Sequence, residues 1–330
     1  MIFYIENRRT EPAFNLALEQ VIFDRAESGH SYFMLWQNRN AVIVGKHQNT
    51  ADEINPVYIK EHNISVVRRL SGGGAVYHDL GNLNFTFIAP VEGNADPDFS
   101  FFCEPVRKAL LSMGVPVEIS GRNDMTVDGM KFSGNAQYKK NNRVMHHGTI
   151  LYDSALETLS HALKPKEKTE TRAIKSVRSP VANIKPYIKN GLDIDGFRSV
   201  LLENMRNIND MRDFYLTPEH LAAAEDLRDR VYSKWEWNYG KSPPYTLRKT
   251  RRIEGCGKVD VMLDIKQEGV IDNIAIYGDF FGNFDPNELC GLLNGHHLEY
   301  NELNLLLKNI DVSRFIHSLK TEAFLSLLFD

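Results

Sequence analysis

Two short turn signals divide the middle of the chain into antiparallel strands. Asp128-Gly129 interrupts the run 125–132, and Asn141-Asn142 interrupts the run 136–152, each between stretches of strand-forming residues. Two-residue hairpin turns hold both central residues at positive φ, which glycine, asparagine and aspartate adopt most readily. The sequence therefore predicts two consecutive hairpins, which neither an all-helical fold nor an all-parallel sheet contains.

Helix and strand patterns alternate in the rest of the chain. Helical spacing of apolar residues predicts helices over 10–28, with Thr10 as N-cap, over 96–114, and over most of 192–240. Strand patterns cover 2–5, 32–37, 41–47, 64–70 and 75–90, and we expect 32–37 and 41–47 to pair across an Asn-Arg-Asn turn. A hairpin over 259–266 and 270–278 then precedes three helices, near 285–293, 300–308 and 312–328.

The proline pair Pro243-Pro244 marks the expected domain boundary. The larger part, 1–245, reads as a mixed sheet with helices packed on it, and the smaller part, 246–330, reads as a compact α+β unit. The fold class is therefore α+β, with a large domain and a small accessory domain. A hinge over 243–250 would let the smaller domain move relative to the larger one.

Composition excludes several classes of protein. The chain has 330 residues, of which 42% are hydrophobic and 25% charged, and its formal net charge is -4, so we expect no general binding of nucleic acid. Three cysteines without ligand spacing argue against a disulfide framework and a zinc site. No run approaches the ~18 apolar residues of a membrane span. We expect a cytoplasmic protein with no membrane partner.

Three consecutive glycines, 72–74, lie between two predicted strands and directly after Arg68 and Arg69. Bare backbone lets a ligand approach closely, and successive N–H groups then bind an anion. The flanking strands and the missing Gly-Lys-Ser/Thr ending exclude a P-loop and a dinucleotide fingerprint. A glycine bend in a sheet is the other interpretation, and ligand contact is favoured over it.

A second group of polar and small residues spans 121–137. The Asp-Gly turn places Lys131 on its second strand, on the opposite face from Met130 and Phe132. A lysine on a strand is usually a solvated edge charge, but here Ser133-Gly134-Asn135 follows it at once. Asn123 and Asp124 precede it, and Asp124 is either a ligand for a metal ion on a nucleotide phosphate or a turn cap.

These segments together resemble the lipoate–protein ligases of the two-domain bacterial type. The resemblance lies in RRLSGGGAVYHDLGNLNF (68–85), GRNDMTVDGMKFSGNA (121–136) and HHGTILY (146–152), with weaker matches at KSVRSPVANI (175–184) and WEWNYGKSPPY (235–245). It implies the catalytic fold shared with biotin ligases and related to class II aminoacyl-tRNA synthetases. It also implies that ATP and Mg²⁺ activate lipoic acid to lipoyl-AMP, with release of pyrophosphate.

The family's acceptor is a lysine of a lipoyl-domain protein, namely the E2 subunits of 2-oxo-acid dehydrogenases and the glycine cleavage H protein. By resemblance, Lys131 is the catalytic cation between the lipoyl carbonyl and the adenylate phosphate. The other residues that the resemblance places against ATP or lipoyl-AMP are Arg69, Ser71, Gly74, Ala75, Val76, Tyr77, His78, Asn123, Asp124, Gly134 and Ala136.

The apolar tail of lipoate requires a hydrophobic pocket. By resemblance, Trp36 lines it together with Tyr77, Arg69, Lys131 and His147, whereas Leu18 is more simply a core residue. His146 and His147 are each either a ligand contact or a structural histidine. The basic stretch 164–178 is a solvated loop, a lid over the adenylate, or a docking patch for an acidic acceptor domain.

Three other interpretations of the function remain open. An ATP-independent octanoyl or lipoyl transferase on the same fold needs a pocket thiol, and Cys103 is better explained as a buried apolar residue, with Cys256 and Cys290 far away in sequence. An inactive lipoate-binding relative is disfavoured because Lys131 and Arg69 are intact. A biotin ligase ranks third, since its glycine-rich signature differs.

Overall fold

The computed structural model describes residues 1–91, 98–120, 123–163, 180–188, 191–239, 247–266 and 269–329. The chain forms two compact units. The larger unit comprises Met1–Ile43, Ile54–Val67 and Val76–Asn238, and the smaller comprises Val44–Glu53, Arg68–Ala75 and Tyr239–Asp330. The glycine run therefore groups with the C-terminal part of the chain. The expected boundary at Pro243-Pro244 and the basic stretch 164–178 lie outside the described residues.

Within the described residues, an eight-stranded mixed sheet forms the centre of the larger unit, in the order β11-β1-β2-β6-β10-β9-β8-β7. Its strands are β1 (Ile2–Glu6), β2 (Ser31–Trp36), β6 (Asn82–Pro90), β7 (Val117–Ser120), β8 (Asp124–Val127), β9 (Met130–Lys140), β10 (Arg143–Leu151) and β11 (Met211–Phe214). β1 runs parallel to β2 and β11, and every pair from β2 to β7 is antiparallel.

Both hairpins predicted for the middle of the chain are confirmed. β8 and β9 meet at Asp128 and Gly129, whose φ angles are 50° and 73°. β9 and β10 meet at Asn141 and Asn142, with φ angles of 50° and 57°. Glycine, asparagine and aspartate adopt such positive φ angles most readily, which is why these residues predicted the two turns.

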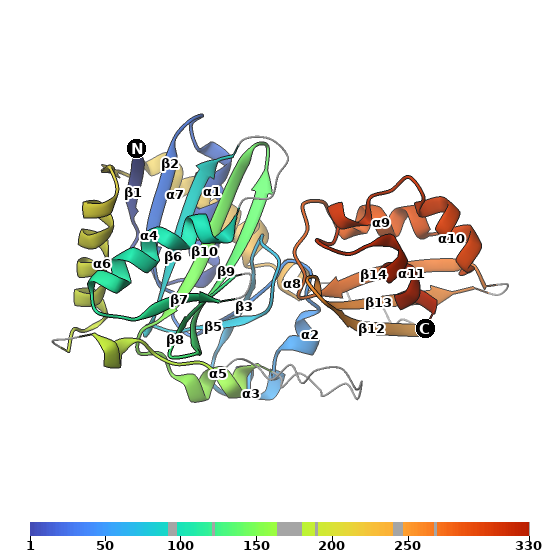
Figure 1. Ribbon diagram of the computed structural model, residues 1–330, viewed down its shortest axis with the longest axis horizontal. Coiled ribbons are helices and arrows are strands. Elements are labelled where there is room, and N and C mark those ends of the chain that lie inside the picture. The colour runs from blue at the N-terminus through green and yellow to red at the C-terminus, as the bar shows by residue number, and fades with distance from the viewer. Residues whose placement is uncertain are drawn as a thin grey trace. The chain divides into compact units, whose positions relative to one another are not determined.

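Helices cover both faces of the large sheet (Figure 1). α4 (Phe99–Ser112) and α6 (Ile194–Ile208) contact each other on one face, and α1 (Pro12–Arg25) and α7 (Pro218–Leu227) contact each other on the other. Phe85 and Phe87 of β6 pack with Phe102 of α4 in the main core. The residues that alternate with Phe85 and Phe87 along β6 therefore face the α1 side of the sheet. The unit also contains α3 (Pro56–Glu61), α5 (Leu156–Ala162) and α8 (Trp235–Asn238).

A small sheet of order β4-β3-β5 accompanies the large one, formed by β3 (Ala41–Val44), β4 (Ser65–Arg68) and β5 (Val76–His78). The predicted pairing of 32–37 with 41–47 is wrong, because β2 lies between β1 and β6 while β3 lies in the small sheet. Asn15 of α1 explains the difference. Its Nδ2 donates to Gln37 O at 2.8 Å and to Asn38 Oδ1 at 2.9 Å, so this link is held by a helix and not by a hairpin turn.

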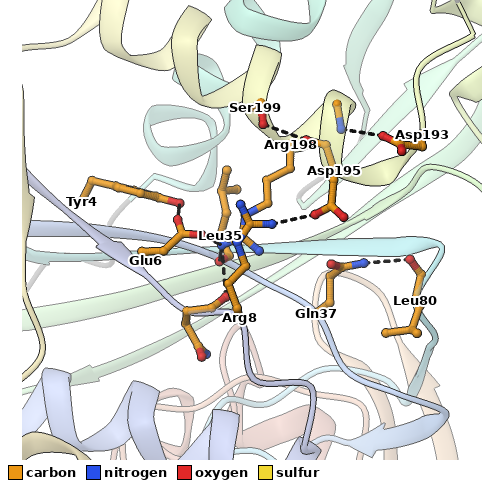
Figure 2. Close-up of polar contacts among 12 residues, drawn as sticks. Tyr4, Glu6, Arg8, Leu35, Gln37, Leu80, Asp193, Asp195, Arg198 and Ser199 are labelled. Carbon is orange, nitrogen blue, oxygen red and sulfur yellow. Dashed lines mark hydrogen bonds and ion pairs between the residues drawn. The ribbon is translucent and has the colours of Figure 1, made fainter.

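Arg198 of α6 is bonded to the backbone near the ends of β1 and β2. Its Nη2 donates to Asn7 O at 3.0 Å and to Leu35 O at 2.8 Å, and the side chain is 2% exposed. Figure 2 shows this guanidinium among Tyr4, Glu6, Arg8 and Leu35. Leu35 directly precedes Trp36, the last residue of β2, so a buried cation is bonded to this strand close to its end.

Three strands of the smaller unit form an antiparallel sheet among its described residues: β12 (Leu247–Ile253), β13 (Gly257–Ile265) and β14 (Ile271–Gly278). Val261 and Leu263 of β13 pack with residues of α9 (Pro286–Leu293), α10 (Tyr300–Leu307) and α11 (Thr321–Phe329). The predicted C-terminal hairpin and the three helices are confirmed, although the last helix begins at Thr321. This unit also contains α2 (Thr50–Glu53).

Other expectations are corrected. α1 begins at Pro12, and Glu11 occupies the N-cap position without a side-chain capping bond, so Thr10 is not the cap. β11 (Met211–Phe214) interrupts the region expected to be helical, where it pairs with β1. β12 (Leu247–Ile253) covers the last part of the range 243–250 in which a hinge is expected, and residues 243–246 lie outside the described residues, so the hinge stays a prediction. No helix in the described ranges is both long and apolar enough to cross a membrane.

Candidate active site

One row of side chains crosses five strands on the α1 side of the large sheet. Trp36 of β2 lies opposite Asn84 of β6, and Asn84 lies opposite Thr149 of β10. The Thr149 hydroxyl accepts a hydrogen bond from Gly134 N of β9 at 3.1 Å. Gly134 lies opposite Asp124 of β8. This site row brings an aromatic side chain and a carboxylate from distant parts of the sequence onto one face.

Lys131 lies over the end of the site row. Its Nζ is 2.7 Å from Asp124 Oδ1, and the two side chains are 31% and 25% exposed. A Cβ at Gly134 would lie 3.1 Å from Lys131 Nζ, so the glycine makes room for the ammonium. Lys131 N donates to Pro180 O at 2.7 Å, and Ala182 N donates to Lys131 O at 3.0 Å. The backbone is thus held on both sides beneath an accessible cation.

Asn123 and Asn135 join the start of β8 to β9. Asn123 Nδ2 donates to Asn135 O at 2.7 Å, and Asn135 N donates to Asn123 O at 2.9 Å. Asp124, the next residue, lies inside β8 and pairs with Lys131, so it does not cap a turn. This double link holds the hairpin that carries the cation and the carboxylate.

The neighbouring row contains a buried carboxylate that the sequence analysis missed. Trp36 Nε1 donates to Thr86 Oγ1 at 2.8 Å, and Thr86 Oγ1 donates to Glu19 Oε1. His147 Nδ1 lies 3.2 Å from the same oxygen, and Ala136 lies opposite His147. Glu19 is 1% exposed. A glutamate beside Leu18 within the apolar pattern of a helix was the signal that could have revealed it.

Two of the three predicted site residues of β5, His78 and Tyr77, point in different directions. His78 lies edge-on to Trp36, with ring centroids 6.2 Å apart, and its Nδ1 is 3.1 Å from Asn38 Nδ2. Tyr77, on the other face of the strand, donates its hydroxyl to Asn40 Oδ1 at 3.0 Å. Burial, with smaller contributions from Asp79 and Tyr58, raises the pKa of Tyr77 to about 12. His78 is therefore grouped with Trp36, and Tyr77 is not.

Arg69, in the smaller unit, is bonded to its own loop. Its Nε donates to Ser71 Oγ at 3.0 Å, and its Nη2 donates to Gly72 O at 2.6 Å and Gly74 O at 2.8 Å. The side chain is 6% exposed, whereas Gly74 and Ala75 are partly exposed. The guanidinium thus holds the conformation of the glycine run through hydrogen bonds to its carbonyl groups.

Each of the three consecutive glycines is explained by a different feature of its surroundings. A Cβ at Gly72 would lie closer than 3.0 Å to Phe280 O, and Gly73 has φ +87°. Gly74 has no atom within 4 Å of its Cβ position. The glycine-bend interpretation therefore accounts for the first two glycines, and Gly74 has the open space that ligand approach requires.

Arg68, which the resemblance did not assign to the site, also makes extensive contacts. Its guanidinium donates to the carbonyls of Gly45, Lys46 and Gln48 at 2.7–3.1 Å and to Thr50 Oγ1 at 2.7 Å. Burial lowers the pKa of its guanidinium to about 10. Arg68 thus organises the segment that precedes the small helix α2.

Cys103 lies in the core on the face opposite the site row. The side chain is 1% exposed and packs with Phe85 and Val106. Its Sγ is 3.8 Å from Nε2 of His146, a fully buried residue stacked near Phe102. Burial raises the pKa of the Cys103 thiol to about 12, so the thiolate is not formed at neutral pH. This thiol is not placed to attack an acyl group.

Metal-ligating side chains are sparse. In the part of the chain that the structure describes, no three or more histidine, cysteine or carboxylate side chains form a group able to hold a metal ion. Asp124 provides a single accessible carboxylate beside Lys131. Mg²⁺ at phosphate sites takes one or two carboxylates and obtains its other ligands from phosphates and water. The arrangement suits a metal ion that arrives with a nucleotide.

Residues 11–206 match the family described as the lipoyl protein ligase A/B catalytic domain, and residues 242–328 match the bacterial lipoate protein ligase C-terminus. The lipoate-protein ligase LplJ of Bacillus subtilis is 40% identical over 333 aligned residues, covering 100% of both chains. The chain belongs to the lipoate–protein ligase family. Lipoate–protein ligase 1 of Staphylococcus aureus is 39% identical and covers 99% of this chain and 100% of its own.

Solved structures agree with the membership in this ligase family. A lipoate-bound protein of P. falciparum has a TM-score of 0.78 and covers 99% of this chain and 97% of its own, and at 21% identity it supports the fold. A lipoate-protein ligase A bound with ATP has a TM-score of 0.62 at 26% identity, covering 72% of this chain and 98% of its own. The predicted fold and the enzyme class, a ligase that forms a lipoyl–lysine amide bond, are confirmed.

Proposed function

We propose that this ligase activates lipoate with ATP at the site row and that Lys131 is the catalytic cation. The observation that carries the proposal is the Lys131 ammonium, held over Gly134 at the end of a row that begins at Trp36. The apolar acyl chain lies toward Trp36, and the carboxylate lies toward Lys131. ATP binding contributes the α-phosphate, which the family's ATP-bound member supports.

The reaction brings two anions together, which explains the need for a fixed cation. A carboxylate oxygen attacks the α-phosphorus, and pyrophosphate leaves with the electrons of the broken P–O bond. Lys131 offsets the repulsion between carboxylate and phosphate and stabilises the charge that develops in the transition state. The acceptor lysine then attacks the acyl carbon of the mixed anhydride, and AMP leaves. Lys131 itself forms no covalent bond in this sequence.

Asp124 is the residue that we assign to Mg²⁺. Its Oδ1 is buried and has no hydrogen-bond partner of proper geometry, although the Lys131 ammonium lies within 2.7 Å. A carboxylate in this position fits a divalent cation carried by the phosphates of ATP. The ion would neutralise phosphate charge. Asp124 also orients Lys131 toward the acyl group.

Nucleotide contact is further proposed for the exposed backbone at Gly74 and Ala75, where a phosphate or ribose could approach the main chain. The proposed acceptors are lipoyl-domain proteins, namely 2-oxo-acid dehydrogenase E2 subunits and the glycine cleavage H protein. A solved relative supports this proposal, because its title pairs a bipartite lipoate protein ligase with an E2 lipoyl domain.

The test is lipoate-dependent exchange of labelled pyrophosphate into ATP. We expect exchange with the wild type and a loss of at least about a thousandfold with Lys131→Ala, because the variant loses the main electrostatic stabilisation. Lys185→Ala is the matched control, since Lys185 also pairs with an aspartate, Asp153, at 2.6 Å. Wild-type protein that shows no exchange, or a Lys131 variant with the activity of the control, would refute the proposal.

A further inference from the structure

A buried amide in the middle of the site row has a donor group without a partner. Asn82 Nδ2 donates to Asn84 Oδ1 at 2.8 Å, and both side chains are at most 1% exposed. Within the described residues, Asn84 Nδ2 and Asn82 Oδ1 have no hydrogen-bond partner. A buried N–H that stays unpaired costs free energy, so such groups generally meet a ligand or an ordered water.

The position of Asn84 favours a ligand. Asn84 lies between Trp36 on β2 and Thr149 on β10. The next strand beyond β10 is β9, which carries Gly134, and Lys131 lies over Gly134. Two strand spacings separate β6 from β9, or about 10 Å. A carboxylate that accepts one hydrogen bond on each oxygen can bridge two nitrogen donors up to about 8 Å apart. Asn84 and Lys131 are therefore suitably spaced to hold one carboxylate between them.

We propose that Asn84 donates a hydrogen bond to the carboxylate of the acyl substrate, opposite the Lys131 ammonium. This inference rests on the proposed function, which supplies the acid as the ligand. One carboxylate oxygen forms the new bond to the α-phosphorus as the bond to pyrophosphate breaks. Asn84 holds the other oxygen, which becomes the carbonyl of the anhydride. A neutral amide orients the acid without cancelling the charge that makes it a nucleophile.

Two variants separate this contact from a packing role. Asn84→Asp keeps the size of the side chain and the acceptor for Asn82 Nδ2, but it removes the donor and places a negative charge beside the substrate. Asn84→Leu removes both polar atoms. The control is Asn204→Leu in α6, where Asn204 accepts a hydrogen bond from Ser112 Oγ at 2.6 Å on the other face of the sheet. Melting temperatures are measured for all three variants.

The readout is the KM of each substrate in the pyrophosphate exchange reaction, with lipoate and with octanoate as the acid. We expect Asn84→Leu to raise the KM of both acids roughly 10- to 100-fold, the usual effect of losing a hydrogen bond to a charged group. Asn84→Asp raises it further. The KM of ATP changes less than about threefold, and the control keeps wild-type values.

Two outcomes would overturn the inference. An unchanged KM for both acids, together with a lower melting temperature, would show that Asn84 serves packing or a bound water. A loss with lipoate alone would place the amide at the dithiolane end. Equilibrium dialysis of octanoate without ATP separates this inference from the proposed function. If acid binding weakens in the Asn84 variants while the wild type shows no exchange, the proposed function fails and the contact stands.

Discussion

Two glycines of the run 72–74, Gly72 and Gly74, should respond in opposite ways to the same added methyl group. In Gly72→Ala, the new Cβ would lie closer than 3.0 Å to Phe280 O and 3.1 Å from Phe281 Cα, both of them backbone atoms. The backbone must therefore move, which costs about 1–3 kcal/mol. In Gly74→Ala, the Cβ meets no atom within 4 Å, and Gly74 does not have the positive φ of Gly73. The free energy of unfolding should change by less than about 0.5 kcal/mol.

The KM of ATP should show the reverse order, with a larger effect for Gly74→Ala than for Gly72→Ala. If bare backbone at Gly74 admits ATP, the methyl group of Gly74→Ala raises the KM of ATP about tenfold or more in pyrophosphate exchange. Thermal unfolding followed by circular dichroism measures the stability of both variants. For a chain of this size, the Gly72→Ala cost should lower the melting temperature by roughly 1–5 °C. An unaltered KM for ATP in Gly74→Ala would refute the assignment of this backbone to the nucleotide. An unaltered melting temperature in Gly72→Ala would refute the packing argument.

Three further predictions concern buried groups. Cys103→Ala should lower stability by about 1–2 kcal/mol but leave pyrophosphate exchange within twofold, and a large loss of exchange would revive a thiol mechanism. Arg68→Ala should destabilise the smaller unit by about 2–4 kcal/mol, seen as faster proteolysis, because it strips the hydrogen bonds from three carbonyls. Burial, with Lys46 and Arg68, lowers the pKa of His47 to about 3, so its neutral form contributes stability above about pH 6.5 that is lost as the pH falls toward 3. His47→Phe should flatten that acid limb of the melting temperature, and an unchanged limb would contradict this prediction.

Local backbone chemistry was readable from the sequence. The turns at Asp128-Gly129 and Asn141-Asn142 were predicted because each requires positive φ, and the structure has those angles. The pairing of strands that are far apart in the sequence could not be predicted. The segments 32–37 and 41–47 were both recognised as extended, but their partners are far away in sequence, and Asn15 holds the link between them.

Edge strands were the main omission of the fold prediction. β11 has the sequence Met-Arg-Asp-Phe, and β12 has Leu-Arg-Lys-Thr-Arg-Arg-Ile. Charged residues on such strands give little apolar alternation, because one edge and one face meet solvent. They form because β1 and β13 provide hydrogen-bonding partners.

The candidate site was predicted in part. Trp36 lies in the site row and Lys131 lies over its end, and their common location depends on the strand register of the sheet. Glu19 and Asn84 were missed, because hydrophobicity patterns mark polar residues as exposed. The alternation of Leu83, Phe85 and Phe87 did contain a signal, since it assigns Asn84 to the opposite face of β6.

The most direct test of the account is to look for the acyl-adenylate itself. Protein mixed with ATP, Mg²⁺ and lipoate, without any acceptor, is denatured and its small molecules are measured by mass spectrometry. The account predicts lipoyl-AMP in amounts close to the amount of enzyme, and its loss in Lys131→Ala. Lipoylation of an acceptor domain that proceeds from a different acyl donor, with no lipoyl-AMP and no need for ATP, would contradict it.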